Sequence, residues 1–113
     1  MSQTLFRTDI ASILVQWKTG MLTNAQVHDW ATDRYAVAAW DPEDGAVNEV
    51  LARLDMMDMN LVTAEDVAGL LAALGERTAE GAARSMDAYQ DTVDLAARKR
   101  RLVDDPLYAR FCN

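Results

Sequence analysis

The feature that most constrains the fold of this chain is the spacing of its apolar residues, which follows the period of an α-helix along most of its length. In the first segment Phe6, Ile10 and Leu14 recur at four-residue intervals, and Ile13 and Trp17 fall on the same face. No stretch of useful length alternates between apolar and polar residues, so no strand is predicted. The pattern predicts an all-α fold.

Helix-start residues divide this pattern into separate helices. Thr23 can cap the backbone N–H of Gln26, and Gln26 can reach back, so a second helix is expected to start here and to carry its apolar face as far as Ala38. In "WDPEDG", Asp41 is placed to be an N-cap and Pro42 suits the first helical position. A third helix is therefore expected directly after Trp40.

Two more helices are expected in the second half of the chain. The fourth opens with Thr63, paired with Asp66, and stops at Gly75. The fifth is the longest, over residues 78–102, and the segment "PLYARF" forms a last helical turn. Short connections favour antiparallel neighbours, so residues 1–113 are predicted to form a single compact bundle of about five helices with a short C-terminal helical turn.

The charge of the chain limits the partners it can have. There are 18 acidic and 11 basic residues, for a net charge of −7. Phosphate contacts need a positive face, so nucleic acid is excluded and a basic protein partner is permitted; solubility alone would also account for the acidity. With one cysteine, Cys112, and with neither a signal peptide nor a membrane span evident, we expect a cytoplasmic protein without a membrane partner. The oligomeric state stays open, and a dimer is possible.

Acidic residues of the predicted fifth helix are the best candidates for a partner-binding surface. They fall within one narrow arc beside the apolar face: Glu80, Asp87, Asp91 and Asp94. Such an arc could steer a basic partner, or could be a solvated flank with local ion pairs. Arg34 joins the candidates because it interrupts the apolar stripe of the second helix. It could lie over the core rim, form a cation–π contact with Trp30, or take part in a buried ion pair.

The only histidine, His28, supports an alternative hypothesis, a small metal-dependent enzyme. Asp29 and Asp33 lie close to it in sequence, but a helical wheel places them on the solvent side, away from His28. The positions one turn after His28 are Ala31 and Thr32, neither of which is a good metal ligand. We therefore expect no catalytic residue, metal or cofactor. Another alternative is a homo-oligomeric structural module with an apolar patch from its three tryptophans, Trp17, Trp30 and Trp40.

The segment "GMLTNAQV", residues 20–27, preceded by Trp17 and followed by Trp30, resembles the opening of small bacterial immunity proteins of the colicin-immunity type. In those proteins an apolar helix, a G-x-[LI]-[ST]-x-x-x-[FV] junction and an aromatic-containing helix follow one another. The likeness covers about a quarter of the chain. It implies an acidic helical bundle that binds and blocks a basic toxin, without enzymatic activity of its own.

Overall fold

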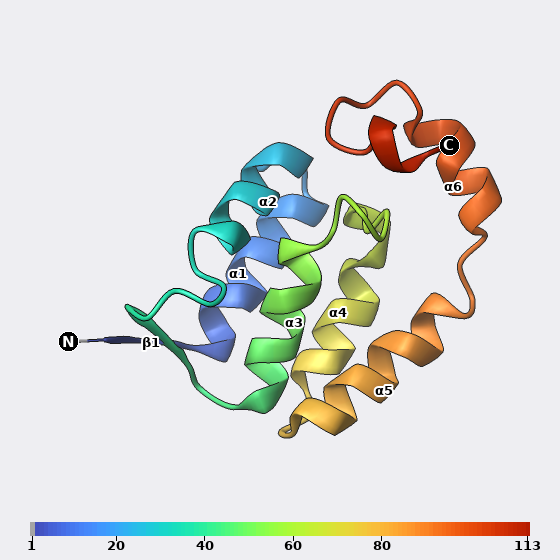
Figure 1. Ribbon diagram of the computed structural model, residues 1–113. Helices are drawn as coiled ribbons and strands as arrows, with labels where there is room; N and C mark the ends of the chain where they lie inside the picture. The colour runs from blue at the N-terminus through green and yellow to red at the C-terminus, as the bar shows by residue number, and fades with distance from the viewer. Residues whose placement is uncertain (1) are drawn as a thin grey trace.

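A computed structural model describes residues 2–113, and it is mostly helical (Figure 1). The helices are α1 (Arg7–Lys18), α2 (Asn24–Thr32), α3 (Gly45–Asp55), α4 (Val67–Leu74), α5 (Ala79–Gln90) and α6 (Leu95–Leu102). Two 3-10 turns, η1 (Ala64–Asp66) and η2 (Ala109–Phe111), and two strands, β1 (Gln3–Leu5) and β2 (Trp40–Pro42), complete the chain. Helices α1–α5 pack together, and α6 lies with the C-terminus at one end of the molecule, away from β1 (Figure 1).

The prediction of a purely helical fold was wrong, because β1 and β2 pair as a small parallel sheet. Thr4 lies opposite Asp41, the Gln3 N–H donates to the Ala39 carbonyl at 2.7 Å, and the Glu43 N–H donates to the Leu5 carbonyl at 2.8 Å. Three residues are too few for an alternating pattern to be visible. The sheet ties the N-terminal segment to the chain that leads into α3.

The expected helix starting at Asp41 was also misplaced. Asp41 belongs to β2, and the N-cap of α3 is Asp44, whose carboxylate accepts a hydrogen bond from the Val47 N–H at 3.0 Å. Helix α2 ends at Thr32, well short of Ala38, and the backbone turns at Ala36, which has a positive φ of 59°. Residues 33–39 therefore form a loop that leads into β2.

The predicted fifth helix, residues 78–102, is two helices. Helix α5 ends at Gln90, and α6 starts after Asp94, whose side chain accepts a hydrogen bond from the Ala97 N–H at 3.0 Å. The Thr92 hydroxyl donates to the Tyr89 carbonyl at 2.6 Å. It thereby provides a hydrogen bond to a carbonyl of the last turn of α5, which has no partner within the helix. The chain is thereby redirected between the two helices.

Other predicted boundaries are confirmed where their chemistry is local. The Gln26 N–H donates to the Thr23 hydroxyl at 3.1 Å, and the Thr23 N–H donates to the Gln26 side chain at 2.9 Å. Gly20 has the expected positive φ, 84°. Thr63 precedes η1, and Gly75 follows α4.

The core is formed by apolar faces of α1, α3 and α4 and by the segment between α3 and η1, with further buried side chains from β1, α2, α5 and the C-terminal segment. Its largest fully buried members include Ile10, Leu14, Val27, Val50, Leu51, Leu54, Met57, Val67 and Tyr108. Arg7 fastens this core at one end, because its guanidinium donates to the Leu74 carbonyl at 2.5 Å and pairs with Glu43 and Asp44 at 2.6 and 2.5 Å. Over residues 2–113, none of the helices is long and apolar enough to cross a membrane.

Candidate functional site

The acidic residues predicted to share one arc are divided by the break between α5 and α6. Glu80 and Asp87 lie exposed on α5, Asp91 is the residue that caps the end of α5, and Asp94 caps the start of α6. Asp87 is 72% exposed and pairs with Arg53 of α3 at 3.2 Å. Only Glu80 and Asp87 therefore remain on the helix to which all four were assigned, and Asp87 faces α3.

An open hollow of about 310 Å³ lies on the outer face of α3, beside this ion pair. It is lined by Glu49, Ala52, Arg53, Met56 and Asn60. The small side chain at Ala52 leaves the space open between its neighbours. Together with Asp87, which Arg53 holds beside the hollow, these residues form what we call the α3 face.

Asp55 adds a carboxylate on the side of α3 that packs against α2. It accepts a hydrogen bond from the Thr32 hydroxyl at 2.9 Å, so its position is fixed by α2. The sequence gives Glu49 and Asp55 no distinguishing motif, and only the helical wheel of residues 45–55 would have placed them outside the core. The structure therefore adds Glu49 to Asp87 as a candidate contact residue, whereas Asp55 is held against α2.

Across the described part of the chain, few carboxylates have a basic partner within ion-pair distance. Six of the 18 acidic side chains do: Glu43, Asp44, Asp58, Glu65, Asp66 and Asp87. Glu49 and Asp55 are not among these six. An acidic surface of this kind attracts positively charged molecules at long range.

His28 serves as a link between α2 and the end of α3. Its Nε2 lies 2.9 Å from the Asp55 carbonyl oxygen, which can only accept, so this nitrogen carries the proton. The same nitrogen lies 3.8 Å from an oxygen of Asp58. Asp29 and Asp33 are exposed, as the helical wheel predicted. Within residues 2–113 no three histidine, cysteine or acidic side chains are grouped in a way that could hold a metal ion.

The predicted cation–π contact of Arg34 with Trp30 is confirmed. The guanidinium carbon lies 4.4 Å from the Trp30 ring centre and 4.9 Å from that of Trp40, and the group donates to the Trp30 carbonyl at 3.0 Å. The positive φ of Ala36 lies in the loop that brings Trp40 onto Arg34. An open hollow of about 240 Å³ lies beside this stack, lined also by Leu5, Asp9, Ser12 and Ile13. Trp17, the third tryptophan, is buried in the core.

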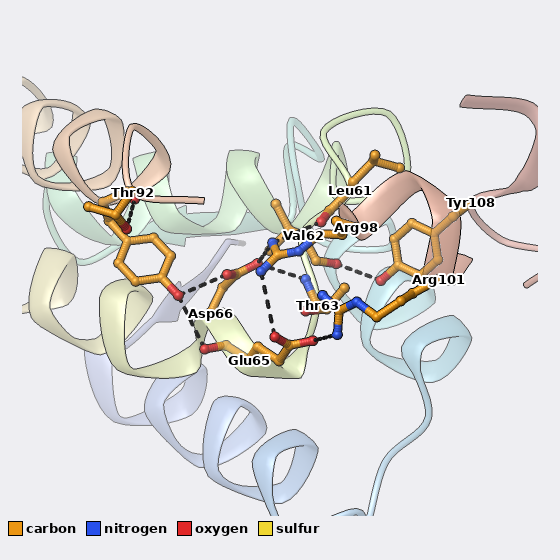
Figure 2. A network of polar contacts seen from close by, with 10 residues as sticks. Leu61, Val62, Thr63, Glu65, Asp66, Thr92, Arg98, Arg101 and Tyr108 are labelled. Carbon is orange, nitrogen blue, oxygen red and sulfur yellow. Dashed lines mark hydrogen bonds and ion pairs between the residues drawn. The ribbon is translucent and has the colours of Figure 1, made fainter. Parts of the chain in front are cut away.

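A buried polar network joins η1 to α6, and sequence reasoning missed it (Figure 2). Asp66 pairs with Arg98 at 2.7 Å, and both side chains are almost completely buried. The Asp66 carboxylate also accepts hydrogen bonds from the Thr63 N–H at 2.8 Å and from the Tyr89 hydroxyl at 3.0 Å. The sequence marked Asp66 as a helix-start residue and Arg98 as one of four cations at a helix end, but it could not pair residues so far apart.

The ionisation of neighbouring groups follows from these contacts. The hydrogen bond from Arg101 is the main reason why the pKa of Glu65 lies below its ordinary value, and Arg98 acts in the same direction. Burial, followed by the hydrogen bond to Asp66, raises the pKa of the Tyr89 hydroxyl. Glu65 thus stays charged to low pH, and Tyr89 stays protonated to high pH.

No family model, curated protein or solved structure matches this chain. Function is therefore inferred from the geometry and charge of its own surfaces. We take the α3 face as the candidate site because carboxylates, the exposed Met56 side chain and an open hollow lie together there.

Proposed function

We propose that this protein is a non-enzymatic binding module that captures a basic protein partner through the α3 face. The observation that carries the proposal is the hollow over α3, where the Glu49 carboxylate and the Met56 side chain lie beside the Asp87 carboxylate that pairs with Arg53. Arg53, the basic residue that lines the hollow, is already paired with Asp87. The face therefore offers negative charge to an incoming cation.

Apolar contact at this face would come from exposed methionines. Met56 and Met59 are 42% and 51% exposed at the end of α3. A thioether side chain is flexible and polarizable, so it adapts to the shape of a partner. Carboxylates around an apolar centre would both speed the encounter and provide a surface to bury.

The resemblance to colicin-immunity-type proteins would make the partner a basic toxin and the protein an immunity or antitoxin-like inhibitor. Of the contact residues predicted from the sequence, Asp87 belongs to the α3 face itself. Glu80, Asp91, Asp94 and Arg34 would act outside it, as charges that influence the approach of the partner. A metal-dependent reaction at His28 gains no support, since its Nε2 is engaged with a backbone carbonyl.

The test is a comparison of two charge reversals in the full-length protein. The probe is a lysine-rich amphipathic helical peptide, with a glutamate-for-lysine version as the negative control. The double variant Glu49→Lys, Asp87→Lys changes the α3 face. The matched control, Asp104→Lys with Asp29→Lys, changes the net charge equally on exposed positions outside that face.

We expect the α3-face variant to lower the association rate constant by roughly an order of magnitude at low salt, and the control variant to lower it only slightly. Stopped-flow fluorescence measures the rate, and far-ultraviolet circular dichroism checks the fold. Equal losses in the two variants would mean that only net charge matters and would remove the α3 face as the binding site.

A further inference from the structure

Residues 95–113, here called the C-terminal arm, differ in charge from the rest of the chain. The arm has five basic and two acidic side chains, whereas residues 1–94 have six basic and sixteen acidic ones. Figure 1 shows the arm at one end of the molecule, joined to α5 by the short connection of residues 91–94. A basic segment is thus attached to an acidic body.

Three arginines of the arm reach carboxylates that lie close together in the body. Arg98 pairs with Asp66 at 2.7 Å, Arg101 with Glu65 at 2.6 Å, and Arg110 with Asp58 at 3.4 Å. Figure 2 shows the first two of these contacts beside each other. We call Asp58, Glu65 and Asp66 the arm-docking site.

Within α6, Arg98 makes polar contacts with the body, and Leu102 packs partly buried against the core. Arg98 is the single buried residue of α6, while Leu95 and Val103, at its two ends, are 40% and 49% exposed. Beyond α6 the main anchor is Tyr108, which is buried and donates to the Val62 carbonyl at 2.5 Å. Leu107, Phe111 and Cys112 pack partly buried beside it, so the apolar attachment of the arm lies at and beyond the end of α6. Attachment limited to this one region favours local opening of the arm.

Two buried polar atoms at this junction have no hydrogen-bond partner in the described residues. They are the Nε of Arg98 and the hydroxyl oxygen of Thr63, and both residues are more than nine-tenths buried. A buried polar group without a partner destabilises the closed arrangement relative to one in which water reaches it. The exposed residues Asp91, Thr92 and Asp94, between α5 and α6, supply a point about which the arm can move.

From these observations we propose that the C-terminal arm opens as a unit, without unfolding the rest of the chain, and that the arm-docking site it uncovers binds a basic helical segment of a partner. The arm itself shows the chemistry that fits: arginines spaced along one helix, with one of them reaching a buried carboxylate. The binding half of this inference rests on the proposed function, whereas the opening half is independent of any partner.

Native-state hydrogen exchange on the full-length protein tests the opening. The Arg98 N–H donates to the Asp94 carbonyl at 3.0 Å and reports on the arm, and amides of α3 report on the body. Asp66→Asn should lower the protection of the arm amides at least tenfold. Ile10→Val, a mild change in the buried core, should lower the protection of α3 amides roughly fivefold and leave the arm amides unchanged. If Ile10→Val lowers protection of arm and α3 amides equally, the arm does not open separately.

A synthetic peptide with the sequence of residues 95–113 tests the binding. In full-length Arg98→Gln the arm is weakened while the arm-docking site is intact, so the peptide should bind this variant at least tenfold more tightly than the unmodified protein. Adding Asp66→Asn should abolish that gain. If the peptide binds Arg98→Gln no more tightly than it binds the unmodified protein, the binding half of the inference is wrong. That result would not affect the conclusions of the α3-face experiment or of the exchange experiment.

Discussion

Replacing Gly69 of α4 by alanine sets a favourable local effect against an unfavourable packing effect. The ring of Tyr89, on α5, lies directly over Gly69. A Cβ atom added there would lie 2.7 Å from the Tyr89 Cγ, 2.8 Å from its Cδ2 and 3.0 Å from its Cδ1. Those distances are too short, and the contact is with the ring carbons nearest the Tyr89 backbone rather than with the far end of the side chain.

The two effects can be given magnitudes. Alanine in place of glycine within a helix stabilises it by about 1 kcal/mol at most. Forcing an extra methyl group into a packed interface costs about 1 to 3 kcal/mol. Tyr89 cannot tilt freely, because its hydroxyl donates to Asp66 at 3.0 Å. We therefore expect Gly69→Ala to lower the free energy of unfolding by about 1 kcal/mol, with an upper limit of about 2 kcal/mol.

Urea unfolding at pH 7, in the unmodified protein and in a Tyr89→Ala background, measures both effects. Without the ring, Gly69→Ala should stabilise the protein by about 1 kcal/mol, so its effect should change sign. An increase in stability on Gly69→Ala in the unmodified protein would refute the packing argument. So would a coupling free energy between the two sites smaller than about 0.5 kcal/mol, the level at which independent sites add.

Three further changes test other parts of the fold. Burial raises the pKa of the Tyr108 hydroxyl above its ordinary 10.0. The stability that the protonated hydroxyl contributes is therefore lost as pH rises above about 10. Tyr108→Phe should lower the free energy of unfolding by about 1 kcal/mol at pH 7, and it should reduce this alkaline loss in urea unfolding measured between pH 7 and 11. Burial acts to raise the pKa of Asp44, but hydrogen bonds from Arg7 and the Val47 N–H hold it below its ordinary value of 3.8. Its stabilisation is therefore present above about pH 4 and lost as pH falls. Arg7→Met should cost about 2 kcal/mol at pH 7, and less at pH 2 to 3, by thermal unfolding. Asp94→Ala removes the N-cap of α6 and should cost about 1 kcal/mol, detected as faster hydrogen exchange in α6 with α3 unchanged.

Helix starts could be predicted from this sequence because their chemistry is local. Thr23 and Gln26 are three residues apart, and the hydrogen bonds that define the capping box join only these two. The apolar period of residues 6–17 likewise needs no information from elsewhere in the chain. Where the start was misplaced, at Asp41, a non-local interaction competed: β1 pairs with residues 40–42 and leaves Asp44 to cap α3.

The break between α5 and α6 shows the limit of periodicity. Apolar residues continue through Val93 and Ala97 with helical spacing, so the pattern is the same for one helix as for two. What ends α5 is a set of side-chain hydrogen bonds by Thr92 and Asp94, together with the attachment of Arg98 to a carboxylate 32 residues earlier in the chain. The hydrogen bonds of Thr92 and Asp94 could be suspected from the sequence, whereas the pairing of Arg98 with a distant carboxylate could not.

The same distinction explains how much of the candidate site was foreseen. Asp87 was identified because it lies on an exposed helical face, which a wheel can show. Its position beside Glu49 and the hollow depends on the packing of α5 against α3 and on the pair with Arg53, and these are tertiary facts. A helical wheel predicts whether a residue is exposed, but it does not predict which residues of other helices lie next to it.

The two acidic surfaces should respond differently to salt, because they differ in burial. Charges on the α3 face are open to solvent, where ions screen interactions beyond about 8 Å at physiological ionic strength. The Asp66–Arg98 pair is buried and is screened much less, although the exposed Glu65–Arg101 pair beside it will weaken. Added salt should therefore slow the encounter with a basic partner strongly while releasing the C-terminal arm only weakly. A partner that uses both surfaces would show a steep salt dependence in its association rate and a shallow one in its dissociation rate, since breaking a buried pair exposes two charges whatever the ionic strength.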